Sequence, residues 1–250
     1  MTNMKKYLPI FYLGIKSSLV YRGNYLIKII TQVLNLIVTL WMWCWLMGNN
    51  VHNFNYLAKY LIMTNTLSLL FSIAPTFTLA DLIQSGKLSN YLTKPVSLYW
   101  YLYLTYIGSQ LPLIIFYLVL GLYFNLNIGF INLILYLIFC SFMFFNLALV
   151  FGSLGFWLIN MWPLKSGLFA IYLLFGGLYF PLSMLGKNIY SWLQYNPFSL
   201  VTDVPAKLIA SNINQTNIYY LAVAVWLIIF YCIYKKTFKL GLKKYEGVGV

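Results

Sequence analysis

The chain has 250 residues, of which 62% are hydrophobic and 8% are charged, and its formal net charge is +13. Soluble domains carry roughly 25% charged residues, so this composition excludes an ordinary soluble protein. The Lys and Arg residues stand at the ends of hydrophobic stretches and not together on one soluble domain, which argues against a nucleic-acid partner.

Apolar stretches near twenty residues in length recur along the chain, which is typical of an all-α integral membrane protein. A β-barrel would instead show ten-residue segments of alternating polarity, and none is visible. We therefore expect a single transmembrane domain over residues 1–250, with six transmembrane helices.

The first segment, residues 1–24, is basic, and its residues Leu8, Phe11 and Ile15 share one helical face. This pattern predicts an interfacial helix that lies on the membrane before the chain enters it. The first four spans that we expect after it cover residues 25–47, 56–78, 98–124 and 133–159.

The fifth apolar segment is unusually short, because only residues 167–180 are cleanly apolar. About 14 helical residues reach about 21 Å, which is less than the roughly 30 Å of a bilayer core. Residues 181–217 then mix apolar and polar groups, and two interpretations stay open: short re-entrant helices, or a surface loop with apolar anchors. The last span is expected over residues 218–234, followed by a basic tail, residues 235–250.

Residues 81–97 form a polar island between the second and third spans. Their apolar positions have helical spacing, with an interruption at Ser85 and Gly86 and an end at Pro95. This predicts either one short amphipathic helix or two half-helices at a membrane surface, whereas the alternative is an ordinary polar loop.

The distribution of Lys and Arg predicts the orientation of the chain. With a cytoplasmic N-terminus and six spans, every Lys and Arg except Lys59, Lys187 and Lys207 falls in a cytoplasmic segment. Both termini and residues 81–97 are then cytoplasmic, and residues 181–217 are external.

Few side chains could support catalysis. The acidic residues are Asp81, Asp203 and Glu246, and the one histidine is His52, so neither a metal site nor a Ser–His hydrolase is indicated. The chain has no phosphate-binding loop, so we expect no enzyme activity, no metal and no bound cofactor. A carrier driven by ions would place ionisable groups within its spans, which here are almost free of charge. The energy for transport must then come from a partner.

Three stretches resemble the membrane subunits of ABC-2-type exporters. Residues 83–88 with 91–95 are similar to that family's Ser-Gly-x-Leu and Leu-x-Lys/Arg-Pro signature after the second span, and residues 241–247 to its Gly-x-x-x-Tyr-Glu ending. The third stretch is external and contains Phe180, Pro181, Trp192, Asn196, Pro197, Phe198 and Pro205. The order of these stretches suits the family along the whole chain.

The resemblance implies a bacterial permease in the plasma (cytoplasmic) membrane that pairs with a second, identical or paralogous permease. Two copies of a separate ATPase would bind ATP and Mg²⁺ and dock on a coupling helix between the second and third spans, while re-entrant helices would close the external end. The residues expected to dock the ATPase are Leu82, Ile83, Ser85, Gly86, Lys87, Leu88, Tyr91, Leu92, Lys94 and Pro95. The expected external gate comprises Pro181, Trp192, Pro197, Phe198 and Pro205.

No charged residue in the spans marks a substrate site. Polar side chains could line a transport path, or could simply pack and hydrogen-bond between helices; these are Tyr106, Gln110, Tyr117 and Asn146. Such walls suit a hydrophobic or amphipathic cargo, such as a lipid-linked molecule, a peptide or an antibiotic. The rival hypotheses are an ion-coupled secondary transporter or channel without an ATPase, and a membrane assembly protein.

Overall fold

The computed structural model describes residues 4–20, 22–47, 51–123, 130–211 and 217–245. Parts of the predicted interfacial helix, of the external region and of the basic tail lie outside the described residues, as do Glu246 and the side chain of His52. The described chain contains helices and no strand, so the all-α prediction is confirmed.

The helices follow one another with short connections. The α-helices are α1 Met4–Val20, α2 Arg22–Met47, α3 Val51–Leu70, α4 Ala74–Gln84, α5 Leu88–Leu92, α6 Leu98–Tyr123, α7 Phe130–Ser153, α8 Trp162–Phe175, α9 Lys187–Leu193, α10 Pro197–Val201, α11 Asp203–Ser211 and α12 Asn217–Lys244. The 3₁₀ turns are η1 Leu154–Phe156 and η2 Leu182–Leu185.

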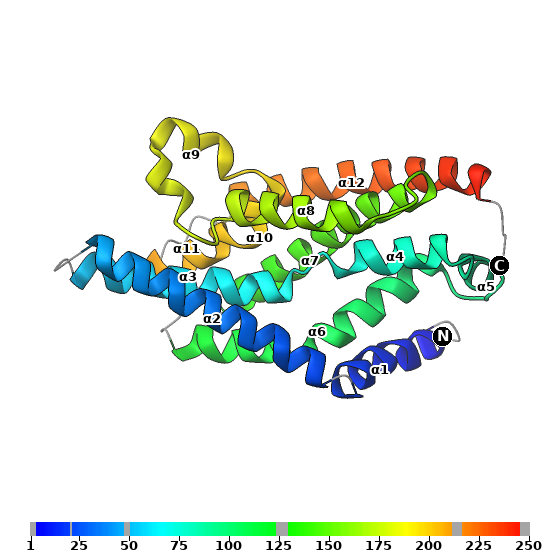
Figure 1. Ribbon diagram of the computed structural model, residues 1–250, viewed down its shortest axis with the longest axis horizontal. Coiled ribbons are helices and arrows are strands. Elements are labelled where there is room, and N and C mark those ends of the chain that lie inside the picture. The colour runs from blue at the N-terminus through cyan, green and yellow to red at the C-terminus, as the bar shows by residue number, and fades with distance from the viewer. Residues whose placement is uncertain (1–3, 21, 48–50, 124–129, 212–216, 246–250) are drawn as a thin grey trace.

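Five helical stretches in the described chain are long and apolar enough to cross a membrane, and they run along the long axis of the molecule (Figure 1). They are Leu26–Met47, Phe54–Gln84, Leu98–Leu120, Asn132–Phe156 and Asn217–Lys244. Helix α8 is a shorter apolar helix of 14 residues, as the short apolar run predicted. The chain is therefore a multi-pass membrane protein.

Several predicted span boundaries differ from the structure. The fourth span ends at Phe156 and not at residue 159, and the short fifth helix covers Trp162–Phe175 and not residues 167–180. The second span extends beyond residue 78 to Gln84, and it breaks between α3 and α4. Pro75 stands in the first turn of α4, where its missing N–H costs no helical hydrogen bond, while its ring disfavours helical backbone at the residue before it. The last helix likewise continues past residue 234 to Lys244, because Phe238 and Leu242 still pack against the neighbouring helices.

Helix α7 forms the centre of the bundle, and α4, α10 and α12 pack on it. Its span is 61% buried, whereas the span in α2 is only 6% buried. The large side chains Tyr136, Phe144 and Phe145 of α7 are almost fully enclosed. The apolar surface of α2 instead faces outward, as expected for a helix whose solvent is lipid.

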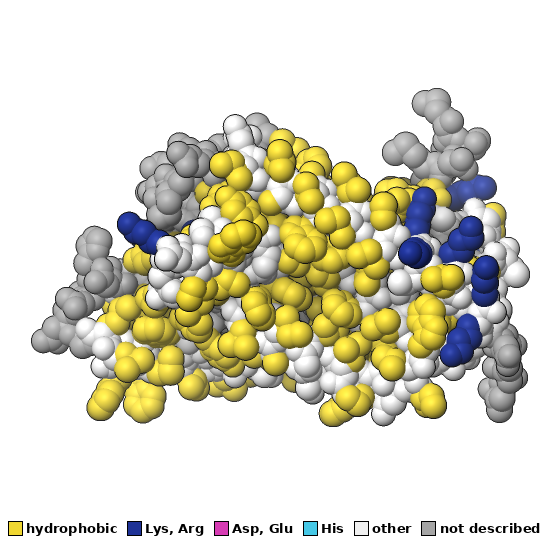
Figure 2. Space-filling view, turned by 90° about the horizontal axis from the view of Figure 1, so that it is seen from above, with side chains coloured by type: hydrophobic (Ala, Val, Ile, Leu, Met, Phe, Trp, Pro, Cys, Tyr) yellow, Lys and Arg dark blue, Asp and Glu magenta, His cyan; other side chains and the backbone are white. Residues whose placement is uncertain are grey.

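The two ends of the molecule differ in charge. Lys and Arg side chains gather at one end, and hydrophobic side chains cover the middle (Figure 2). This basic end carries α1, α5 and the C-terminal turns of α12 (Figure 1). The short helices α9, α10 and α11 lie toward the other end.

Candidate functional site

The polar island between the second and third spans folds as two helices joined by a sharp turn. Helix α4 ends at Gln84, and α5 begins at Leu88. Gly86 between them has φ +69°, a left-handed conformation that costs other residues roughly 1–2 kcal/mol. Of the two arrangements expected from the sequence, the structure has the two half-helices. We call residues 81–97 the coupling corner.

The ten candidate docking residues separate by burial. Ile83 and Leu88 are 6% and 0% exposed and belong to the hydrophobic core. Three others are partly buried: Leu82, Gly86 and Tyr91. The exposed ones, which a partner could reach, are Ser85, Lys87, Leu92, Lys94 and Pro95. The family resemblance implied these ten residues, and it could not separate the buried ones from the exposed ones.

Aromatic contacts attach the second half of the coupling corner, which includes α5, to helix α6. The Nζ atom of Lys94 lies 4.3 Å from the centroid of the Tyr91 ring, a cation–π distance. The Tyr91 ring packs in turn against Tyr101 of α6, with 4.9 Å between the ring centroids. The short helix α5 is thus attached to the start of the third span.

The C-terminal tail also binds the coupling corner. The Tyr245 hydroxyl donates a hydrogen bond of 2.7 Å to the Gly86 carbonyl and accepts one of 3.3 Å from the Ser89 amide. The stretches that resembled the family signature and the family ending, 159 residues apart, therefore meet in one site. Sequence reasoning did not pair them, because no local signal links residues so far apart.

The tail and the end of α4 also contact the segment after α7. The Phe156 ring lies so close to Gly241 that a methyl group there would overlap it, and it packs edge-on against Tyr245 at 6.0 Å. The Gln84 side-chain amide donates to the carbonyls of Leu158 and Ile159, at 2.8 and 3.2 Å. The coupling corner is therefore connected to α4, α6, α7 and α12.

A buried carboxylate organises the opposite end. Asp203 at the start of α11 has no exposed surface. It accepts hydrogen bonds from the Tyr60 hydroxyl at 2.6 Å, the Leu182 amide at 3.3 Å and the Tyr190 hydroxyl at 3.3 Å. Lys207 lies one turn later, with its Nζ 3.4 Å from the carboxylate. Burial lowers the pKa of Lys207, and the charge of Asp203 opposes that shift.

The five candidate gate residues differ in how far they are exposed. Pro181 and Pro205 are buried, Phe198 is 9% exposed and Pro197 is partly buried. Trp192 on α9 is 84% exposed. Helices α10 and α11 pack on α7 and α3, so four of these residues belong to the packed bundle, and Trp192 alone of the five projects from it.

The candidate path residues are all buried within the subunit. The Tyr106 hydroxyl donates to the Leu70 carbonyl at 2.9 Å. The Asn146 amide donates to the Phe142 carbonyl at 2.7 Å and to the Tyr99 hydroxyl at 3.2 Å. Three of the four, Tyr106, Gln110 and Tyr117, line open pockets.

Metal-binding side chains are few among the described residues. Among them, no three His, Cys, Asp or Glu side chains lie close enough to hold a metal ion. The arrangement offers exposed side chains at the coupling corner, a network of buried polar contacts and open pockets.

Comparison with known proteins identifies the family. A search of curated proteins finds no match to this chain. A family model described as "ABC-2 family transporter protein" matches residues 19–249, which include the coupling corner and the contact of Tyr245 with it. The match covers nearly the whole chain, which therefore belongs to the ABC-2 family of transporter proteins.

Proposed function

We propose that the chain is the membrane-spanning permease of an ATP-driven exporter in the bacterial cytoplasmic membrane. It moves a hydrophobic or amphipathic molecule out of the cell, using ATP that a separate ATPase hydrolyses with Mg²⁺. Two ATPase copies serve a pair of permeases, which are identical or paralogous. Family membership supports a permease that is not itself catalytic within an ABC transporter.

The observation that carries this proposal is the contact between Tyr245 and Gly86. A docking helix can drive transport only if its movement reaches the spans. Here α5 carries the exposed side chain of Leu92 and directly follows the exposed Lys87, while Tyr245 ties the turn before α5 to the end of α12. A force applied to α5 would therefore act on α4 and α12 together.

The same proposal assigns an orientation. The basic end faces the cytoplasm, as expected from the positive-inside rule, and α8 serves as a sixth, short crossing. Helices α10 and α11 then enter the membrane from outside and close the external end of the path. Their burial against α3 and α7 supports this role, because irregular backbone at membrane depth must be covered by protein.

Co-purification from native membranes tests the docking surface. Leu92 in α5 is 48% exposed, and Leu240 near the end of α12 is also 48% exposed, so they form a matched pair. We expect the wild type and the Leu240→Asp variant to retain a soluble-domain ATPase, and the Leu92→Asp variant to lose it. Equal retention by both variants, with equal amounts of folded permease, would contradict docking at α5.

The source of energy needs a separate measurement. Vesicles that contain the permease with its ATPase should hydrolyse ATP and move cargo without any ion gradient. If no ATPase accompanies the wild type in several mild detergents, and flux instead follows an ion gradient, the chain is a secondary transporter.

A further inference from the structure

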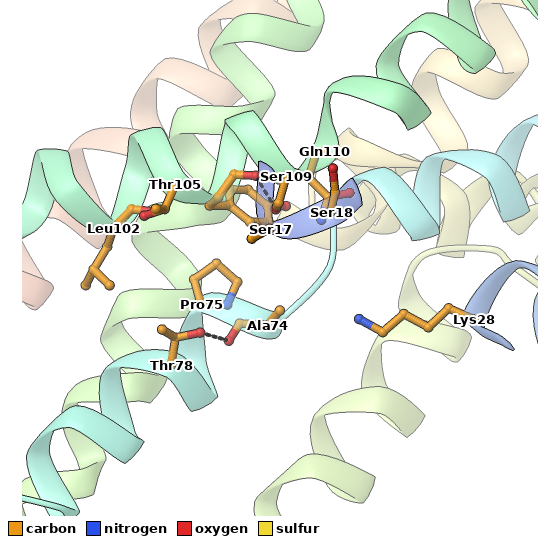
Figure 3. A pocket seen from close by; sticks show the side chains of 11 residues that line it. Ser17, Ser18, Lys28, Ala74, Pro75, Thr78, Leu102, Thr105, Ser109 and Gln110 are labelled. Carbon is orange, nitrogen blue, oxygen red and sulfur yellow. Dashed lines mark hydrogen bonds between the residues drawn. The ribbon is translucent and has the colours of Figure 1, made fainter. Parts of the chain in front are cut away.

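A hollow that is lined by two lysines and by both polar and apolar side chains lies at the break between α3 and α4. It has two parts, which share Lys28, Ala74 and Gln110. One part, of about 320 Å³, lies between α1, α4 and α6, and the other, of about 430 Å³, lies between α2, α4 and α8. Figure 3 shows the first part, with the ammonium group of Lys28 directed toward Ala74 and the start of α4.

The charged groups around this hollow are positive. Lys28 from α2 and Lys165 from α8 line its larger part, and no Asp or Glu is among the described residues that line either part. Lys28 belongs to the first candidate span. Both lysines are exposed, and Lys28 stands at the start of its span, where a long side chain can extend toward the membrane surface. Their two positive charges would stabilise an anion at the mouth of the hollow. The hydrogen-bonding side chains beside the two lysines are Gln32, Ser68 and Ser72.

Buried polar atoms next to the hollow have no hydrogen-bond partner in the described chain. Gln110 is 8% exposed and lines both parts, and its side-chain Oε1 is unpaired. Tyr172 is 3% exposed and lines the larger part, and its hydroxyl is unpaired. Because buried polar groups nearly always have a partner, the Tyr172 hydroxyl points to a ligand that supplies an acceptor, whereas the Gln110 Oε1 atom needs a donor such as water or a ligand hydroxyl. The Tyr172 hydroxyl can donate to an anionic oxygen.

An apolar slot of about 140 Å³ lies beside the hollow. Gln110 and Tyr106 line both the slot and the smaller part of the hollow. The apolar side chains of the slot include Leu70, Ile107, Ile114, Leu118, Ile134 and Leu137. The hollow and the apolar slot are therefore neighbours that share the side chains of Gln110 and Tyr106.

We infer that the hollow and the slot together bind an anionic amphipathic molecule: a phosphate or carboxylate head between Lys28 and Lys165, and a hydrocarbon part in the slot. Such a molecule would reach the hollow from the cytoplasmic leaflet, where the basic end lies. That it is the exported cargo rests on the proposed function, whereas the binding chemistry rests on the hollow itself. The same head chemistry occurs in a lipid and in free phosphate, and the experiment separates the two.

Native mass spectrometry of the purified full-length chain, in a neutral detergent, measures this binding. The probes are dioctanoyl phosphatidic acid, dioctanoyl phosphatidylcholine and inorganic phosphate. We expect the phosphatidic acid to bind at least about tenfold more tightly than the phosphatidylcholine. A lysine near an anionic lipid contributes about 1 kcal/mol, so Lys28→Gln and Lys165→Gln should each weaken binding about fivefold, and the double variant about 30-fold.

Matched variants show whether the hollow and the slot are responsible. Lys236→Gln removes the same charge from an exposed position on α12 and should leave binding unchanged. Ile114→Trp fills the slot and should weaken binding of the phosphatidic acid, whereas Ile115→Trp, at a neighbouring position that is 54% exposed, should not.

Several outcomes would overturn the inference. Equal binding of the two lipids would show that the hollow does not recognise an anionic head. If Lys236→Gln weakened binding as much as Lys28→Gln, the effect would come from general surface charge. If inorganic phosphate displaced the phosphatidic acid at an equal concentration, the hydrocarbon part would contribute nothing to binding. The measurement needs no ATPase, so a failure here leaves the co-purification result intact, and a missing ATPase leaves the binding result intact.

Discussion

The coupling corner and the Asp203 network, toward opposite ends of the molecule, use polar residues in opposite ways (Figure 1). At the coupling corner, Lys87 and Lys94 are exposed, and the carbonyl of Gly86 accepts hydrogen bonds from the distant Tyr245 and from the nearby Ser89 hydroxyl. At the other end, the carboxylate of Asp203 is enclosed and hydrogen-bonded on several sides. The first arrangement suits contact with a partner, and the second holds the chain together.

The need for the Asp203 network follows from the size of the elements that it joins. Helices α10 and α11 have 5 and 9 residues, and helices shorter than about 12 residues are marginal alone. Asn196 caps α10 by accepting hydrogen bonds from the amides of Phe198 and Ser199, each at 2.8 Å. Asp203 then ties the start of α11 to α3 through Tyr60.

The largest effect should come from removing the buried carboxylate. Asp203→Ala leaves Tyr60 and Lys207 without that acceptor, and breaking a buried polar pair in this way costs about 3–5 kcal/mol. We expect loss of the folded protein in fluorescence-detected size-exclusion chromatography, or a large drop in the thermal midpoint. Asp81→Ala, at an exposed position on α4, should change stability by less than about 0.5 kcal/mol. Equal midpoints for the two variants would show that the network does not stabilise the fold.

The burial of Asp203 also shows where sequence reasoning ends. Hydropathy counts an aspartate as a surface residue, so residues 181–217 could not be assigned to a loop or to packed helices. Burial depends on partners from α3 and η2, which are distant in the chain. The turn at Gly86 could be predicted, because glycine and the neighbouring polar residues favour a turn through local backbone conformation alone. The burial of Ile83 and Leu88 could not be predicted, because their partners in the core include Phe145 on α7, which is distant in the chain.

The second largest effect should come from separating the tail from the coupling corner. In Gly241→Val the new side chain would overlap the Phe156 ring, and overpacking of this kind costs about 1–3 kcal/mol. We expect lower thermal stability and weaker stimulation of the partner ATPase. Gly167→Val on α8 is the control, because no neighbouring atom lies within 4 Å of the position of its new Cβ. If Gly241→Val and Gly167→Val reduce stimulation of the ATPase equally, the contact of Gly241 with Phe156 has no part in coupling.

A smaller effect is expected from the tail hydroxyl alone. Tyr245→Phe keeps the ring against Phe156 and removes both hydrogen bonds to the coupling corner, for a net loss of about 1 kcal/mol. Hydrogen exchange at the Ser89 amide should become about fivefold faster, because that amide loses its acceptor. Tyr179→Phe, at a position that is 43% exposed, should leave this exchange unchanged. Unchanged exchange in Tyr245→Phe would mean that the hydroxyl does not hold the corner.

The smallest effect concerns the exposed charge of Lys94. Its contact with the Tyr91 ring contributes about 0.5–1 kcal/mol at an exposed site, so Lys94→Gln should barely change stability. Charges at the rim of an interface mainly govern association rate and its dependence on salt. We therefore expect slower binding of the ATPase, with a weaker salt dependence, in surface plasmon resonance. Lys187→Gln, at an exposed position on α9, should leave both unchanged, because α9 lies away from the coupling corner. If Lys187→Gln were the variant that slowed binding, the ATPase would approach the end that carries Asp203, and the proposed orientation would be reversed.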